Sequence, residues 1–143
     1  MMDNRDIDKW FNDHGIKDVA YTIRNGRVNI SKHLDMSNLK IESFPFPFGT
    51  VKEAFIINDN LLTNFKNFPT NVGGDFEANN NKFTSLEGMP QCKSGIDLSM
   101  NEIGSFEGIQ ETIYSHLLID HNLLASLKGA PKSIAKSFMI SNN

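Results

Sequence analysis

The sequence predicts a repeat solenoid of the α/β type that is mostly β and carries a small cap at its N-terminus. Asparagines recur at intervals of 21, 20, 21 and 21 residues: Asn60, Asn81, Asn101, Asn122 and Asn143. Each lies five residues after an apolar residue, and a second apolar residue follows the first four at a spacing of two. A fixed period of about 20 to 50 residues is typical of stacked repeats that share one continuous core.

Each repeat begins with an apolar–any–apolar step, which fits a short strand with two side chains directed inward. The inward pairs are Leu34/Met36, Phe55/Ile57, Phe76/Ala78, Ile96/Leu98, Leu117/Ile119 and Phe138/Ile140. The asparagine falls in the turn after the strand, where its amide can satisfy backbone groups that the bend removes from the sheet. We therefore expect a buried asparagine ladder. The rest of each repeat, with its Gly and Pro residues, is expected to return as irregular or 3₁₀ chain.

The pattern apolar–x–apolar–x–x–Asn–x–apolar resembles the leucine-rich repeat. The returns TSLEGMPQC (84–92) and ASLKGAPKSI (125–134) are similar to those of the short bacterial subclass, and equally to small repeat proteins encoded by bacteriophages. The resemblance covers residues 34–143 and implies a right-handed coil with a parallel sheet, in five full units plus a terminal half unit. The chain departs from the pattern in three ways. Leu39 replaces the ladder asparagine of the first unit, Phe replaces Leu at many core positions, and Asn101 comes one residue earlier than the period of 21 requires.

Residues 1–33 lack the repeat and are expected to form the N-terminal cap. Acidic residues at the start of the segment 6–14, with Gly15 after its end, predict a short helix. Alternating apolar residues around Asn25-Gly26 predict a β-hairpin over 19–30. Trp10 shares the apolar face of the helix, so we expect it in the core of the cap.

The printed sequence stops at Asn143, on the turn of an incomplete repeat. Three interpretations remain open. The chain is a fragment, its C-terminal edge pairs with a second copy to form a homodimer, or the half unit is sufficient cover. An uncovered strand edge favours pairing with another chain.

The composition argues against several classes of function. A net charge of −3 gives no general attraction to nucleic acid or to an anionic membrane. The single cysteine, Cys92, precludes an internal disulfide and falls at a core position of a return, so we expect a buried thiol and not a nucleophile. Neither a secretory signal nor a stretch of membrane-spanning length is visible, and the expected location is the cytoplasm of the producing or infected cell. No cofactor is expected.

Side chains that alternate with the inward pairs are expected on the concave face of the coil. Six of them are acidic: Asp35, Asp59, Asp75, Glu77, Asp97 and Asp120. None is Lys or Arg, although the chain contains 14 such residues. The same face carries Ile56, Met100, His116, Leu118, His121 and Met139. A surface lined by one sign of charge attracts the opposite sign, so we expect it to bind a protein with a basic surface. The alternative is that the acids merely keep an exposed sheet soluble.

The sequence offers little support for an enzyme. His116, His121, Asp97 and Asp120 form the densest titratable cluster, but their spacing implies neither convergent metal ligands nor a base oriented beside a nucleophile such as Ser99. Two functions therefore remain. The first is a non-enzymatic protein–protein interaction module, as in a phage or bacterial effector that inhibits a host protein by blocking it. The alternative is a structural protein that homo-oligomerises through its uncapped C-terminal repeat.

Overall fold

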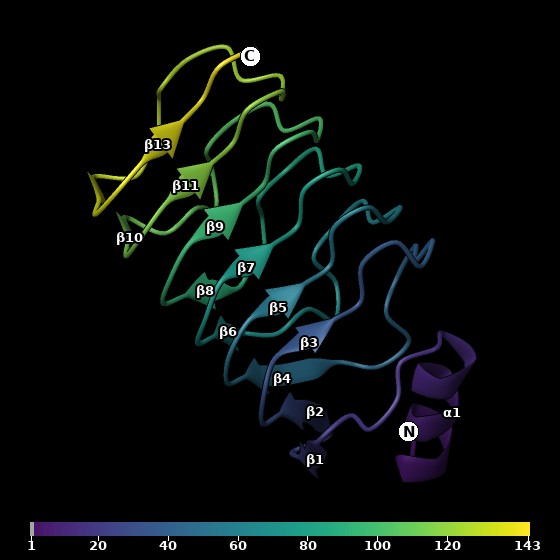
Figure 1. The fold of residues 1–143 in the computed structure, drawn as a ribbon. Coiled ribbons are helices and arrows are strands. Elements are labelled where there is room, and N and C mark those ends of the chain that lie inside the picture. The colour runs from purple at the N-terminus through teal and green to yellow at the C-terminus, as the bar shows by residue number, and fades with distance from the viewer. Residues whose placement is uncertain (1) are drawn as a thin grey trace.

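The protein is a β-solenoid with one short helix at its N-terminal end. The computed structural model describes residues 2–143. Helix α1 (Asn4–Asp13) is followed by the hairpin strands β1 (Tyr21–Arg24) and β2 (Arg27–Ile30). The chain then winds in stacked coils, so that the two termini lie at opposite ends of the stack (Figure 1). This arrangement confirms the predicted mostly-β repeat solenoid with an N-terminal helix.

One side of the solenoid is a parallel sheet of six two-residue strands, one from each coil. Its strands are β3 (Leu34–Asp35), β5 (Phe55–Ile56), β7 (Phe76–Glu77), β9 (Ile96–Asp97), β11 (Leu117–Leu118) and β13 (Phe138–Met139). The first residues of these strands pair in register from Leu34 to Phe138. These first residues point inward and are buried in every coil but the last, where Phe138 is 38% exposed.

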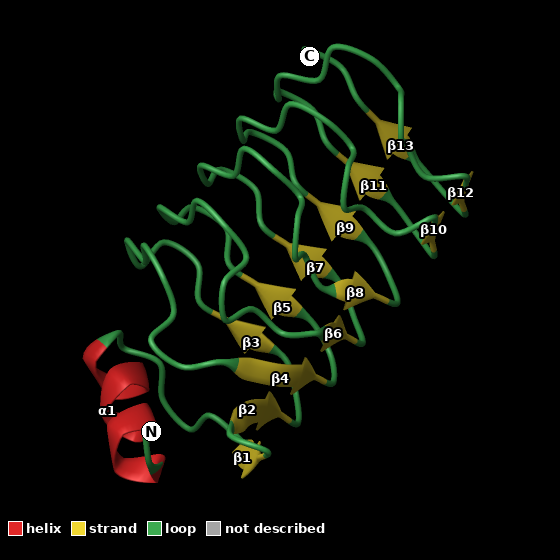
Figure 2. Cartoon of the chain, turned by 180° about the vertical axis from the view of Figure 1, so that it is seen from behind, coloured by secondary structure: helices red, strands yellow, loops and turns green. Residues whose placement is uncertain are grey.

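The returns are more regular than the sequence indicates, because they form sheets of their own (Figure 2). A five-stranded sheet has the order β1-β2-β4-β6-β8, and β10 pairs separately with β12. The return strands are β4 (Phe48–Val51), β6 (Asn71–Val72), β8 (Gln91–Cys92), β10 (Thr112–Ile113) and β12 (Ser133–Ile134). Residues 2–143 contain no 3₁₀ segment. Backbone groups of the returns lie one coil apart, so they pair from coil to coil as those of the first sheet do.

The N-terminal elements differ slightly from their predicted bounds. The helix begins at Asn4 and not at residue 6, because Asp3 caps it: the Asp3 carboxylate accepts from the Asp6 backbone N–H, and the Asp6 carboxylate accepts from that of Asp3. The hairpin strands start at Tyr21, and β2 runs parallel to β4, so the hairpin extends the return sheet. Trp10 is half-buried, with its ring 5.4 Å from that of Phe46, at the junction between cap and coils.

Phenylalanines of neighbouring coils stack inside the solenoid. The rings of Phe65 and Phe83 lie 4.3 Å apart and nearly parallel, and those of Phe55 and Phe76 lie 6.2 Å apart. Because neighbouring strands are separated by about 4.8 Å, a ring in one coil packs against a ring in the next. The core therefore runs the length of the stack without a break.

The periodic asparagines form a continuous ladder of hydrogen bonds. Asn60, Asn81, Asn101 and Asn122 are 4 to 7% exposed. In each of them the side-chain oxygen accepts a backbone N–H of the preceding coil, and the amide donates to carbonyls of its own and the preceding coil. Asn143 repeats this pattern in the last coil, where its side chain is exposed.

Candidate functional site on the outer face of the six-stranded sheet

The outer face, meaning the solvent side of the six-stranded sheet, carries most of the predicted binding residues in regular rows. The second strand residues form one row across the sheet: Asp35, Ile56, Glu77, Asp97, Leu118 and Met139. Asp75 and His116 belong to the row just before the strands, and Asp120 to the row just after them. The structure thus brings nine of the predicted residues onto one continuous surface.

The remaining three predicted residues, Asp59, Met100 and His121, lie at the turn just before the ladder asparagine. The residue at this point has a left-handed backbone in every coil, with φ between 53° and 59°. Asn and Asp tolerate this conformation better than other non-glycine residues, and they occupy four of the six positions. The turn thus has a backbone reason for its Asn and Asp residues, independent of any partner.

The acidic side chains are held in place by hydrogen bonds within the chain. Asp75 Oδ1 accepts from the Gly95 backbone N–H at 2.9 Å and from Ser94 Oγ at 2.7 Å. Glu77 Oε1 accepts from Asn58 Nδ2 at 3.2 Å. Asp35, Asp59, Asp97 and Asp120 likewise accept from side chains or backbone N–H groups on the same or the neighbouring coil. These carboxylates therefore have a structural role, and they are presented in defined orientations.

None of the six carboxylates has a basic partner within residues 2–143. The ion pairs of the described chain join Lys9 to Asp13, Glu111 to Lys132, and Glu53 to His33 when that histidine is protonated. An unneutralised row of like charges creates a negative potential over the sheet, and such a potential attracts cationic groups. The outer face thus combines fixed orientation with uncompensated charge.

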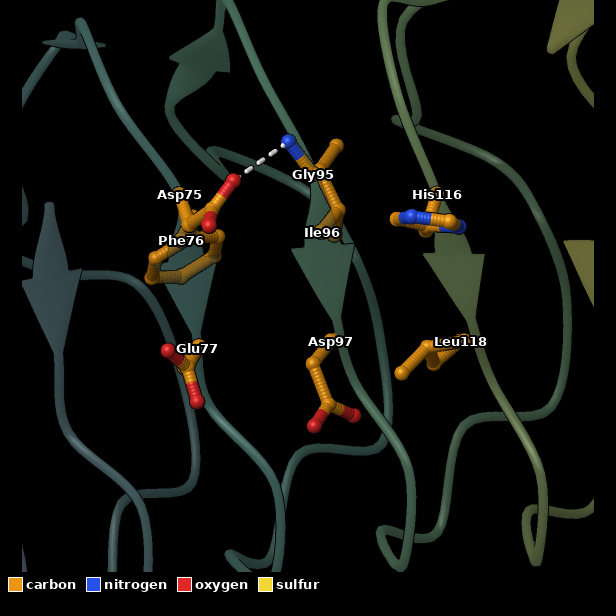
Figure 3. A pocket seen from close by; sticks show the side chains of 8 residues that line it. All are labelled: Asp75, Phe76, Glu77, Gly95, Ile96, Asp97, His116 and Leu118. Atoms are coloured by element: carbon orange, nitrogen blue, oxygen red, sulfur yellow. Dashed lines mark hydrogen bonds between the residues drawn. The ribbon is translucent and has the colours of Figure 1, made fainter. Parts of the chain in front are cut away.

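A shallow hollow of about 130 Å³ interrupts this face at Gly95 (Figure 3). The carboxylates of Asp75 and Glu77 lie on one side of it, and His116 and Leu118 lie on the other. Asp97 lies between them, on the same strand as Gly95. The exposed surface of the hollow is mostly apolar. This place unites residues from three neighbouring coils, and only the stacking of the coils brings them together.

The titratable groups of the face are not clustered as metal ligands in the described chain. No group of three or more His, Cys, Asp or Glu side chains among residues 2–143 is arranged to hold a metal ion. His116 Nδ1 accepts from the Ser137 backbone N–H at 3.3 Å, and Ser99 Oγ donates to Asp97 Oδ1 at 2.7 Å. Away from the face, Cys92 is 2% exposed, and burial raises the pKa of its thiol to about 12. That thiol is protonated at neutral pH.

One residue with a structural role was missed in the sequence. Gln110 sits where the return sheet is interrupted, between β8 and β10. Its side-chain oxygen accepts from the Cys92 N–H at 2.7 Å, and its amide donates to Cys92 O at 2.7 Å and to Thr112 O at 2.8 Å. The side chain thus replaces a strand-to-strand pairing. The spacing of the repeats gives no signal for it, because Thr112 follows Gln91 by 21 residues, as Ser133 follows Thr112.

The fold and the site define the class of this protein as a β-solenoid with an acidic outer sheet face. Comparison with protein-family models, with curated proteins and with solved structures finds no match to this chain. No helix within residues 2–143 has the length and apolar character that crossing a membrane requires.

Proposed function

We propose that this protein is a non-enzymatic recognition module that binds a partner protein with a basic surface through the outer face. The observation that carries the proposal is that the outer face holds five oriented carboxylates, and that none of them has a Lys or Arg counterion among the described residues. Charge complementarity of this kind steers association and rejects partners of the same sign. The six strands span about 25 Å, which is the scale of one ordinary protein–protein contact.

Nucleic acid and anionic membranes are not the proposed partners, because the same carboxylates repel phosphate groups. The resemblance to short leucine-rich repeats of bacteria and bacteriophages supports an effector that inhibits a host protein by covering part of its surface. Under this proposal the protein acts in the cytoplasm of the producing or infected cell, without a cofactor or a metal.

The test separates charge from structure by neutralising acids while keeping their acceptor oxygens. In the triple variant Asp75→Asn, Glu77→Gln, Asp97→Asn, an amide oxygen can still accept the hydrogen bonds that hold residues 75 and 77. Residue 97 keeps the bonds from Ser99 but loses the one from Asn79, because Asp97 accepts through both of its oxygens. The matched control, Glu87→Gln, Glu102→Gln, Glu107→Gln, makes the same change of charge at exposed acids in turns outside the outer face. Both variants and the unchanged protein are used to capture partners from a bacterial lysate.

The proposal expects a protein that binds the unchanged chain and the control but not the outer-face variant, with binding that weakens as salt is added. Equal capture by all three proteins would remove the outer face as the binding site. Urea unfolding of each variant accompanies the experiment, so that a loss of binding is not mistaken for a loss of fold.

A second candidate function is assembly through the last coil. The specific observation in its favour is the exposure of apolar side chains there: Leu123 at 65%, Leu127 at 62%, Met139 at 50% and Phe138 at 38%. We propose that a second copy covers this surface and that the free edge of β13 pairs with its counterpart. Light scattering after size exclusion tests it, because a strict monomer at the highest soluble concentration excludes the homodimer. If the dimer forms, Leu127→Ser should dissociate it.

A further inference from the structure

The hollow in the outer face exists because one coil lacks a side chain in the row before the strands. The other coils place His33, Ala54, Asp75, His116 and Ser137 in this row, and Gly95 stands between Asp75 and His116. Its backbone is not left-handed, so the conformation does not demand glycine. A Cβ at this position would meet Asp75 Oδ1 at 3.1 Å and no other atom closer than 3.6 Å. Glycine therefore avoids crowding Asp75 Oδ1 and leaves the hollow open beside that carboxylate.

Two carboxylates of the hollow each keep an oxygen free of hydrogen bonds within the described chain. Asp75 is held through Oδ1, and Glu77 through Oε1. Asp97 is held through both of its oxygens, by Ser99 and by Asn79. Asp75 Oδ2 and Glu77 Oε2 are thus available to an incoming donor without loss of the bonds that orient these side chains.

We propose that this hollow receives an arginine side chain of the partner protein, an inference that rests on the proposed recognition function. The guanidinium group has five N–H donors in a rigid plane, so it can bridge Asp75 and Glu77, which a single ammonium group does less well. Its aliphatic stem can pack against Leu118, on the side of the hollow opposite Asp75 and Glu77. The three carboxylates lie within one small hollow, which concentrates the attraction for a cation at this point.

The probe is N-acetyl-arginine amide, titrated into the ¹⁵N-labelled protein at constant ionic strength. N-acetyl-citrulline amide is the neutral match, and N-acetyl-lysine amide tests the choice of arginine. The expected result is a set of amide shifts at Gly95, Ile96 and Leu118 for the arginine probe, with no comparable shifts for citrulline. Equal shifts from citrulline, or shifts confined to other coils, overturn the proposal. Lysine binding as tightly as arginine overturns the assignment to arginine.

Variants test whether the arginine probe binds in the hollow. Gly95→Leu fills the hollow and should weaken binding of the arginine probe by about tenfold, equivalent to about 1.4 kcal/mol. Ser137→Leu places the same side chain in the same row two coils away and should leave the affinity unchanged. Asp75→Asn with Glu77→Gln gives a second route that adds no bulk, and it should weaken binding similarly. Unchanged affinity in both Gly95→Leu and the double variant refutes the site.

The same variants distinguish this inference from the recognition function. If the Gly95→Leu variant still captures the partner and the neutralised outer-face variant does not, the outer face is the binding surface but the hollow is not the binding site for arginine. If the neutralised outer face also retains the partner, both proposals fail.

Discussion

Replacing Asn81 by leucine is the most direct test of how the asparagine ladder holds the coils together. Asn81 is 7% exposed, and its oxygen accepts the Leu62 backbone N–H at 3.1 Å. Its amide donates to Ile57 O at 2.9 Å and to Ala78 O at 3.3 Å. Leucine has a similar size, and Leu39 already occupies the equivalent position of the first coil. The substitution therefore removes the polar contacts with little change in volume.

The expected cost is set mainly by one backbone group. Ile57 O also accepts from Asn60, and Ala78 O also accepts from Asn101, so both carbonyls retain a partner after the substitution. The Leu62 N–H has no such reserve, and a buried donor without an acceptor costs about 1–3 kcal/mol. The substitution should therefore lower the free energy of unfolding by about 1–3 kcal/mol, well below the sum of all the lost hydrogen bonds.

Urea unfolding at 25 °C, followed by circular dichroism, measures this change. The matched control is Asn143→Leu, which removes the same contacts in the last coil, where the side chain is exposed and water can replace it. We expect the control to cost less than about 0.5 kcal/mol. The reasoning is refuted if Asn81→Leu is neutral, or if the control costs as much.

Three other predictions follow from the same structure. Gln110→Met should lower the free energy of unfolding by about 1–3 kcal/mol, because it leaves the Cys92 N–H without its acceptor. The control Gln91→Met, at an exposed position, should be nearly neutral, and equal urea midpoints for the two variants would contradict this. Met100→Asn should raise the same free energy by about 0.5–1 kcal/mol, because Met100 is held at a φ of 57° that asparagine adopts more easily; a lower urea midpoint would contradict this. Iodoacetamide at pH 8 should alkylate Cys92 only as the protein unfolds, and fast labelling of the folded protein would disprove this. The free energy of unfolding should fall as the pH rises from about 8.5 towards 12, because the thiol ionises at a lower pH in the unfolded chain than in the folded one.

The repeat architecture was predictable because periodic burial leaves a periodic sequence. The apolar residue five positions before each asparagine starts the strand in every coil, and the strands pair in that register. The same register placed Asp35, Glu77 and Asp97 on one face, since alternate residues of a strand point to opposite sides. The assignment to leucine-rich repeats and the function of the outer face stay predictions.

The return strands were not predictable, because strands such as β6 and β8 bury only one residue each and so lack the apolar–any–apolar step that marks the other sheet. The role of Gln110 was not predicted, because its side chain takes the place of a backbone peptide group and only the position of the neighbouring coil reveals this. The bounds of α1 shifted because Asp3 and Asp6 cap one another.

The sequence by itself determined the coil, its register, the buried ladder and the segregation of acidic from basic residues, because these properties repeat along the chain. Only the tertiary structure decided which groups from different coils meet. It placed Gly95 between Asp75 and His116, engaged one oxygen of Asp75 and of Glu77, and left the other oxygen of each free. The physical reason is that contacts between coils join residues about 20 positions apart, and their geometry depends on the stacking of the whole solenoid.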